Sequence, residues 1–119
     1  MPVEPFTWRP LTRRESEVLD ALLREDFPGA QELRAQIAST IVSGGCGCGC
    51  PTVYLSVGDT AEAAPTTTRV PVGADVSDTI GDYVLLFTDN GRLSSLEYAW
   101  IEQPPREFPG ADRLVPHAR

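Results

Sequence analysis

The chain of 119 residues carries 17 acidic residues against 10 basic ones, all of them arginine, for a net charge of −7. A hydrophobic fraction of 41% with 23% charged residues is typical of a globular protein and excludes a disordered one. The length fits a single domain over residues 1–119. The acidic charge argues against a nucleic-acid partner, because that affinity depends on clustered Lys and Arg, and it suits a basic protein partner.

The cellular location follows from what the sequence does not contain. No apolar run approaches the ~20 residues of a membrane span. Residues 1–5 lack the basic and apolar regions of a signal peptide. We therefore expect a cytoplasmic protein without membrane contact, in which thiols stay reduced.

The first 40 residues predict an arm and two helices. Three prolines over residues 1–10 favour an extended arm. Thr12-Arg13-Arg14-Glu15 matches a capping box, and the apolar period behind it predicts a helix to about Glu25. The proline of the corner at residues 26–29 ends this helix, and a second short helix follows with Leu33 facing inward. Together these segments predict a helical hairpin.

Three strands are predicted from the middle of the chain. Residues 40–43 and 52–57 have the period of two that is typical of half-buried strands. Residues 69–76 suggest a third strand, which Pro71 and Gly73 would restrict to an edge or a bulge. An exposed strand edge is a template for pairing with a second chain, so we expect a homodimer as one form of partner.

The strongest local pattern is Asn90-Gly91 between two apolar runs, residues 83–88 and 92–101, which predicts a type I′ hairpin. A two-residue turn would pair Leu85 with Leu96 and Tyr83 with Tyr98. Beyond it, residues 115–119 are expected to form a loose tail. The whole pattern predicts an α+β domain, with the N-terminal helical hairpin packed on an antiparallel sheet of four or five strands.

All three cysteines, Cys46, Cys48 and Cys50, lie in one glycine-rich loop between predicted strands. In an extended strand alternate Cα atoms would be about 6.6 Å apart, whereas thiolates around one zinc ion lie about 3.8 Å from each other. The loop must therefore curl to bind metal, which its glycines permit. Zinc would also need a fourth ligand, and the candidates are His117, Asp59 or a second chain.

Two other interpretations of the cysteine loop stay open. A Cys46–Cys48 or Cys48–Cys50 disulfide would close a small strained ring of the kind that suits a redox sensor. Alternatively, small residues were selected for fit, with cysteine acting as a compact hydrophobe in a bent strand passing under a helix. The odd number of cysteines in any case rules out a closed disulfide framework within one chain.

Catalytic motifs are not found. The chain has neither a G-x-S-x-G nucleophile elbow nor a phosphate-binding glycine loop, and its only histidine is close to the C-terminus. We therefore predict no catalytic residues and no cofactor, with zinc at the three cysteines as the alternative. The sequence favours a non-catalytic protein.

Three strings resemble a family of small actinobacterial conserved proteins: the Cys46–Pro51 loop, the 26–30 corner and the Asn90–Tyr98 hairpin. The similarity runs from about Leu11 to Leu114. It implies a self-contained cytoplasmic domain, and it implies no substrate, cofactor or catalytic residue. We expect an acidic protein-binding domain with a regulatory or immunity-like role; the alternative is a metal- or thiol-site protein using Cys46, Cys48 and Cys50.

Overall fold

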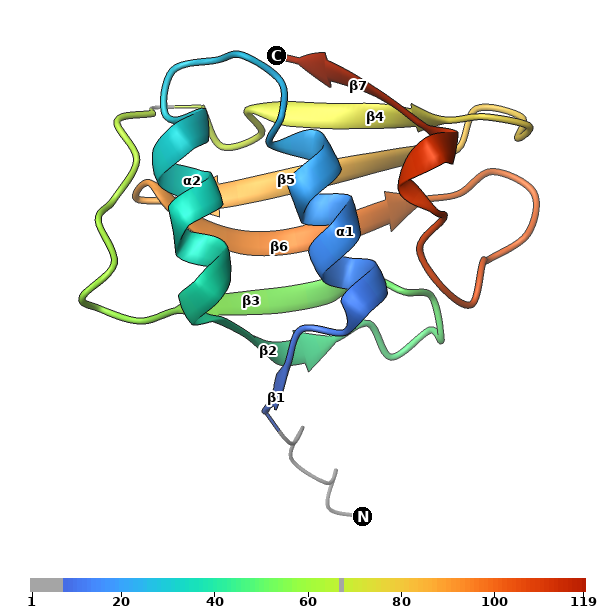
Figure 1. The fold of residues 1–119 in the computed structure, drawn as a ribbon. Helices are drawn as coiled ribbons and strands as arrows, with labels where there is room; N and C mark the ends of the chain where they lie inside the picture. The colour runs from blue at the N-terminus through green and yellow to red at the C-terminus, as the bar shows by residue number, and fades with distance from the viewer. Residues whose placement is uncertain (1–7, 67) are drawn as a thin grey trace.

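The computed structural model describes residues 8–66 and 68–119 as an α+β fold, in which two α-helices lie on one face of a seven-stranded antiparallel sheet (Figure 1). The strand order is β1-β2-β3-β6-β5-β4-β7. The strands are β1 (Arg9–Pro10), β2 (Thr40–Gly45), β3 (Val53–Val57), β4 (Val72–Val76), β5 (Tyr83–Asp89), β6 (Arg92–Ala99) and β7 (Leu114–Ala118). Of the predicted arm at residues 1–10, all but the last three residues lie outside the described residues. None of the described helices is long and apolar enough to cross a membrane.

The helices are α1 (Arg13–Leu22) and α2 (Ala30–Gln36), followed by the short 3₁₀ turn η1 (Ile37–Ser39); a second such turn, η2 (Ala111–Arg113), precedes β7. The predicted capping box is confirmed: Glu15 N donates to Thr12 Oγ1 at 3.1 Å, and Thr12 N donates to Glu15 Oε1 at 2.9 Å. Burial raises the pKa of Glu15, but hydrogen bonds from Arg9 and Thr12 outweigh it and hold the pKa below 4.5. The Arg9–Glu15 ion pair, with both contacts at 2.9 Å, thereby ties β1 to α1.

The predicted helical hairpin is wrong, although the predicted buried faces are right. Val18, Leu19 and Leu33 are fully buried, as the apolar period indicates. The main neighbours of α1, however, are β4, β7 and η2, while α2 lies against β6. A helical period shows which face of a helix is buried but not which element covers that face. Here both helices pack against the sheet, and not mainly against each other.

The strand count of four or five is also wrong, because the end of the predicted arm forms β1, which pairs with β2, and the predicted loose tail forms β7. This strand pairs with β4 along its whole length, from Val76–Leu114 to Val72–Ala118. Its first residue, Leu114, is buried, and Arg119 N donates to Pro71 O at 2.8 Å beyond its end. Strand β4 is therefore an interior strand and not an edge, so the edge that suggested a homodimer is covered.

The Asn90-Gly91 turn joins β5 and β6 as predicted. Both residues have positive φ, +51° and +75°, as a type I′ turn requires. The predicted pairing of Leu85 with Leu96 and Tyr83 with Tyr98 is wrong by one residue. The observed pairs are Leu86–Leu96 and Val84–Tyr98.

A β-bulge causes this shift of register. The ladder pairs Thr88 with Leu93 and next Phe87 with Ser95, which leaves Ser94 as the extra residue of β6. Because side chains alternate along a regular strand, Leu93 and Leu96 would otherwise point to opposite faces. The bulge allows both leucines to be buried in the core.

Candidate metal centre

The three cysteines lie on the loop between β2 and β3, at one end of the sheet. The last residue pair of the β2–β3 ladder is Gly45–Val53. Beyond it, Cys46 N donates to Thr52 O at 3.2 Å and closes the loop. Gly49 has φ +90°, a left-handed conformation that glycine adopts without a steric penalty and that turns the chain back on itself. The buried Thr52 anchors the loop to β6, because its Oγ1 accepts a 3.0 Å hydrogen bond from Tyr98 N.

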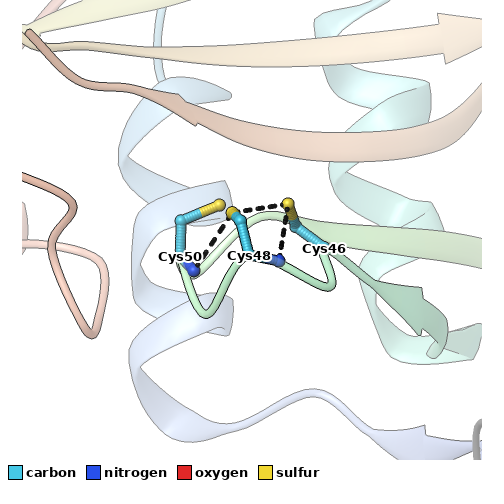
Figure 2. A group of neighbouring side chains, drawn as sticks. All are labelled: Cys46, Cys48 and Cys50. Atoms are coloured by element: carbon cyan, nitrogen blue, oxygen red, sulfur yellow. Dashed lines mark hydrogen bonds between the residues drawn. The ribbon is translucent and has the colours of Figure 1, made fainter.

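The curled loop brings the three thiols together (Figure 2). Their sulfur atoms all lie within 4.8 Å of one another, and the Sγ atoms of Cys46 and Cys48 are 2.7 Å apart. Cys48 N donates to Cys46 Sγ at 3.5 Å, and Cys50 N donates to Cys48 Sγ at 3.4 Å. Each of these two sulfurs thus accepts a hydrogen bond from the amide two residues further along the loop.

This geometry answers the question that the C-x-C-x-C spacing left open. A bent strand buried under a helix is not what forms, because the loop is curled, Cys48 is exposed, and Cys46 and Cys50 are half-buried. The three sulfurs could hold one metal ion. Around zinc the closest pair would separate by about 1 Å to reach the usual sulfur–sulfur distance. Open space beside Gly47 and Gly49 favours such a shift.

Among the described residues the cysteine triad is the only group of three or more side chains that could hold a metal ion, and no fourth protein ligand joins it. His117 lies on β7, where its Nε2 is 2.8 Å from Asp75 Oδ2. Asp59 is exposed in the loop after β3 and is not part of the group. The site therefore offers three sulfur donors.

The thiols differ in acidity. Burial alone would raise the pKa of Cys50, but hydrogen bonds from Cys48 and Thr52 outweigh it and lower the pKa to about 7, from an ordinary value of 9.0. The pKa of Cys48 is raised to about 11 by its hydrogen bonds to Cys46 and to Cys50. Near neutral pH Cys50 therefore ionises more readily than Cys48, and its thiolate accepts a hydrogen bond from the Cys48 thiol.

Arginines gather beside the loop, a feature that sequence reasoning missed. Arg9, Arg14 and Arg106 line a cavity of about 400 Å³ that is also lined by Cys46 and Cys50. They come from β1, α1 and the segment after β6. No local pattern indicates this grouping, because residues almost 100 positions apart meet only in the folded chain.

No protein-family model, curated protein or solved structure matches this chain. The resemblance to small actinobacterial proteins therefore remains a prediction, and the chemistry of the site has to be argued from its own residues.

Proposed function

We propose that the protein binds a metal ion that prefers thiolate ligands, zinc being the first candidate, through Cys46, Cys48 and Cys50. The observation that carries the proposal is the convergence of three sulfurs on an exposed loop, all within 4.8 Å. Thiolates favour zinc and copper(I) over hard ions such as magnesium and calcium. Metal binding requires the thiolate form, and the pKa of Cys50 is lowered to about 7.

The number of ligands indicates what kind of site this is. Structural zinc sites are closed by four protein ligands, whereas sites with three protein ligands leave one position for an external donor. The loop lies at the end of the sheet, and none of its cysteines belongs to the hydrophobic core. We therefore expect the domain to fold without metal, and the ion to be bound for exchange or for chemistry rather than to hold the fold together.

Mass measurement tests this proposal directly. The reduced protein is mixed with one equivalent of zinc, and its native mass is compared with its denatured mass. We expect an excess of one zinc ion in the native protein. The excess should vanish in the variant with Cys46→Ser, Cys48→Ser and Cys50→Ser, while its circular dichroism spectrum stays unchanged.

Two results would contradict the metal proposal. One is a native mass without zinc, and the other is a zinc excess that survives in the triple variant. If no metal binds and an added small-molecule disulfide oxidises the protein, with the loss of two hydrogens from its mass, a redox-active thiol pair becomes the better account of the loop.

A second candidate function is binding of a protein partner in a regulatory or immunity-like role, as the acidic charge suggests. The observation that favours it is the sheet face opposite the helices, which no described element covers in Figure 1. Tyr54 is 51% exposed there, and Leu85 and Phe87 on β5 are only partly buried. Aromatic side chains on an uncovered face are frequent anchors of protein interfaces.

This second candidate has its own test. A basic partner captured by the wild-type chain should be lost with Tyr54→Lys and retained with Val115→Lys on β7, a matched change at a residue of similar exposure (48%) near the edge of the sheet. Equal recovery of the partner with both variants would contradict binding through the centre of this face. Self-association in sedimentation would instead identify a second copy as the partner.

A further inference from the structure

The cavity beside the cysteine loop suggests which external ligand the metal centre accepts. This cavity of about 400 Å³ has the size of a small-molecule site. Its walls come from β1, the start of α1, the cysteine loop and the segment after β6. In Figure 1 the cysteine loop and the segment after β6 lie at the same end of the sheet.

The charge of the cavity walls is opposite to that of the whole protein. Three of the ten arginines line it, although the chain has a net charge of −7. Two glutamates, Glu15 and Glu107, also line it, so the arginines are in excess by one. A positive pocket on an acidic protein favours anions over the cations that the remaining surface attracts.

The arginines differ in how far they are already engaged. Arg9 is held by Glu15 through both of its Nη atoms. Arg14 Nη1 donates to Phe108 O at 2.8 Å and is 3.9 Å from Glu107 Oε1. Arg106 belongs to none of the ion pairs formed within the described part of the chain, residues 8–66 and 68–119. Its side chain is exposed. Arg106 is therefore the guanidinium with the most donors left for a ligand.

We propose that this cavity binds a small thiol that carries a carboxylate, and that its sulfur completes the coordination of the metal held by Cys46, Cys48 and Cys50. The inference rests on the proposed metal function, which leaves the fourth ligand to an external donor. The carboxylate suits the arginines of the cavity, because a guanidinium pairs with a carboxylate through two parallel hydrogen bonds. The thiol suits the metal, because a site with three thiolates selects ions that prefer sulfur as the fourth donor. Cys46 and Cys50 line both the metal centre and the cavity, so one small molecule can reach both.

Cobalt(II) makes the coordination visible, because its d–d absorption changes when a fourth ligand binds. The full-length protein is first loaded with one equivalent of cobalt, and the metal:protein ratio is measured before any thiol is added. It is then titrated with mercaptoacetate or with 2-mercaptoethanol, which carries a hydroxymethyl group in place of the carboxylate. We expect mercaptoacetate to saturate the site at about tenfold lower concentration.

Arginine variants assign the preference to the cavity. Arg106→Ala should weaken mercaptoacetate binding by about tenfold and leave 2-mercaptoethanol unaffected, because only the carboxylate contact is lost. Arg24→Ala is the matched control: Arg24 is exposed, pairs with Asp20 at 2.7 Å and does not line this cavity. It should change neither titration.

The possible failures are distinguishable. If cobalt does not bind, the metal function itself is wrong. If cobalt binds but the two thiols bind equally well, or Arg106→Ala leaves the preference intact, the anion site is wrong and the metal function stands. If one cobalt ion is shared by two chains, the fourth ligand comes from a second copy, and the small-molecule ligand is overturned.

Discussion

Replacing Cys48 with serine is expected to lower zinc affinity by a factor on the order of a hundred. A hydroxyl group is a harder donor than a thiolate and is not ionised at neutral pH, so one of three sulfur ligands is lost. Competition with a chromophoric chelator measures this loss. The matched control is Gly47→Ala in the same loop, where an added Cβ meets no atom within 4 Å; it should keep the wild-type affinity.

The pH dependence of zinc affinity gives this prediction a second readout. The pKa of Cys48 is raised to about 11, so this thiol is protonated between pH 7.5 and 9 and must release its proton when zinc binds. That proton alone makes the affinity rise about tenfold per pH unit. In the wild-type protein the affinity should therefore rise at least about tenfold per pH unit over this range. An affinity that does not change with pH, or that is the same in Cys48→Ser, would show that Cys48 is not a metal ligand.

Replacing Gln36 with alanine is expected to destabilise the fold by about 3 kcal/mol, the sum of a buried unsatisfied donor and a small cavity. Gln36 ends α2 and is 1% exposed. Its Nε2 donates to Glu62 O and to Gly91 O, both at 2.9 Å, and its Oε1 accepts from Leu93 N at 3.0 Å. Without it, the amide of Leu93 is buried without a partner.

Urea unfolding measures this effect, with a loss of about 10 °C in the melting temperature as the thermal equivalent. Gln31→Ala is the matched control, since Gln31 lies on the exposed side of the same helix and should change stability by less than about 0.5 kcal/mol. Similar unfolding midpoints for the two variants would mean that Gln36 does not join α2 to the β5–β6 turn in solution.

Local features of this protein could be predicted because their causes are local. The capping box at Thr12 and Glu15 needs only hydrogen bonds within one helical turn. The Asn90-Gly91 turn needs two adjacent residues that tolerate positive φ. The cysteine triad belongs to the same class, since alternate positions on a short glycine-rich loop place three thiols near each other once the loop curls. That the loop does curl was a condition that the sequence left open.

Features that join distant segments were decided only by the tertiary structure. The bulge at Ser94 shifts the hairpin by one residue because both Leu93 and Leu96 are buried in a core that other elements complete. Residues 114–118 form a strand only because β4 offers an unpaired edge.

The same distinction holds for the candidate site and for Gln36. The three cysteine ligands are visible in the sequence, but the arginines beside them are separated by most of the chain. Gln36 looks like an ordinary polar helix residue until the β5–β6 turn is packed against it. Side-chain chemistry and short-range spacing thus determined which donors this protein has. The packing of remote backbone segments decided what surrounds those donors, because it depends on the whole core at once.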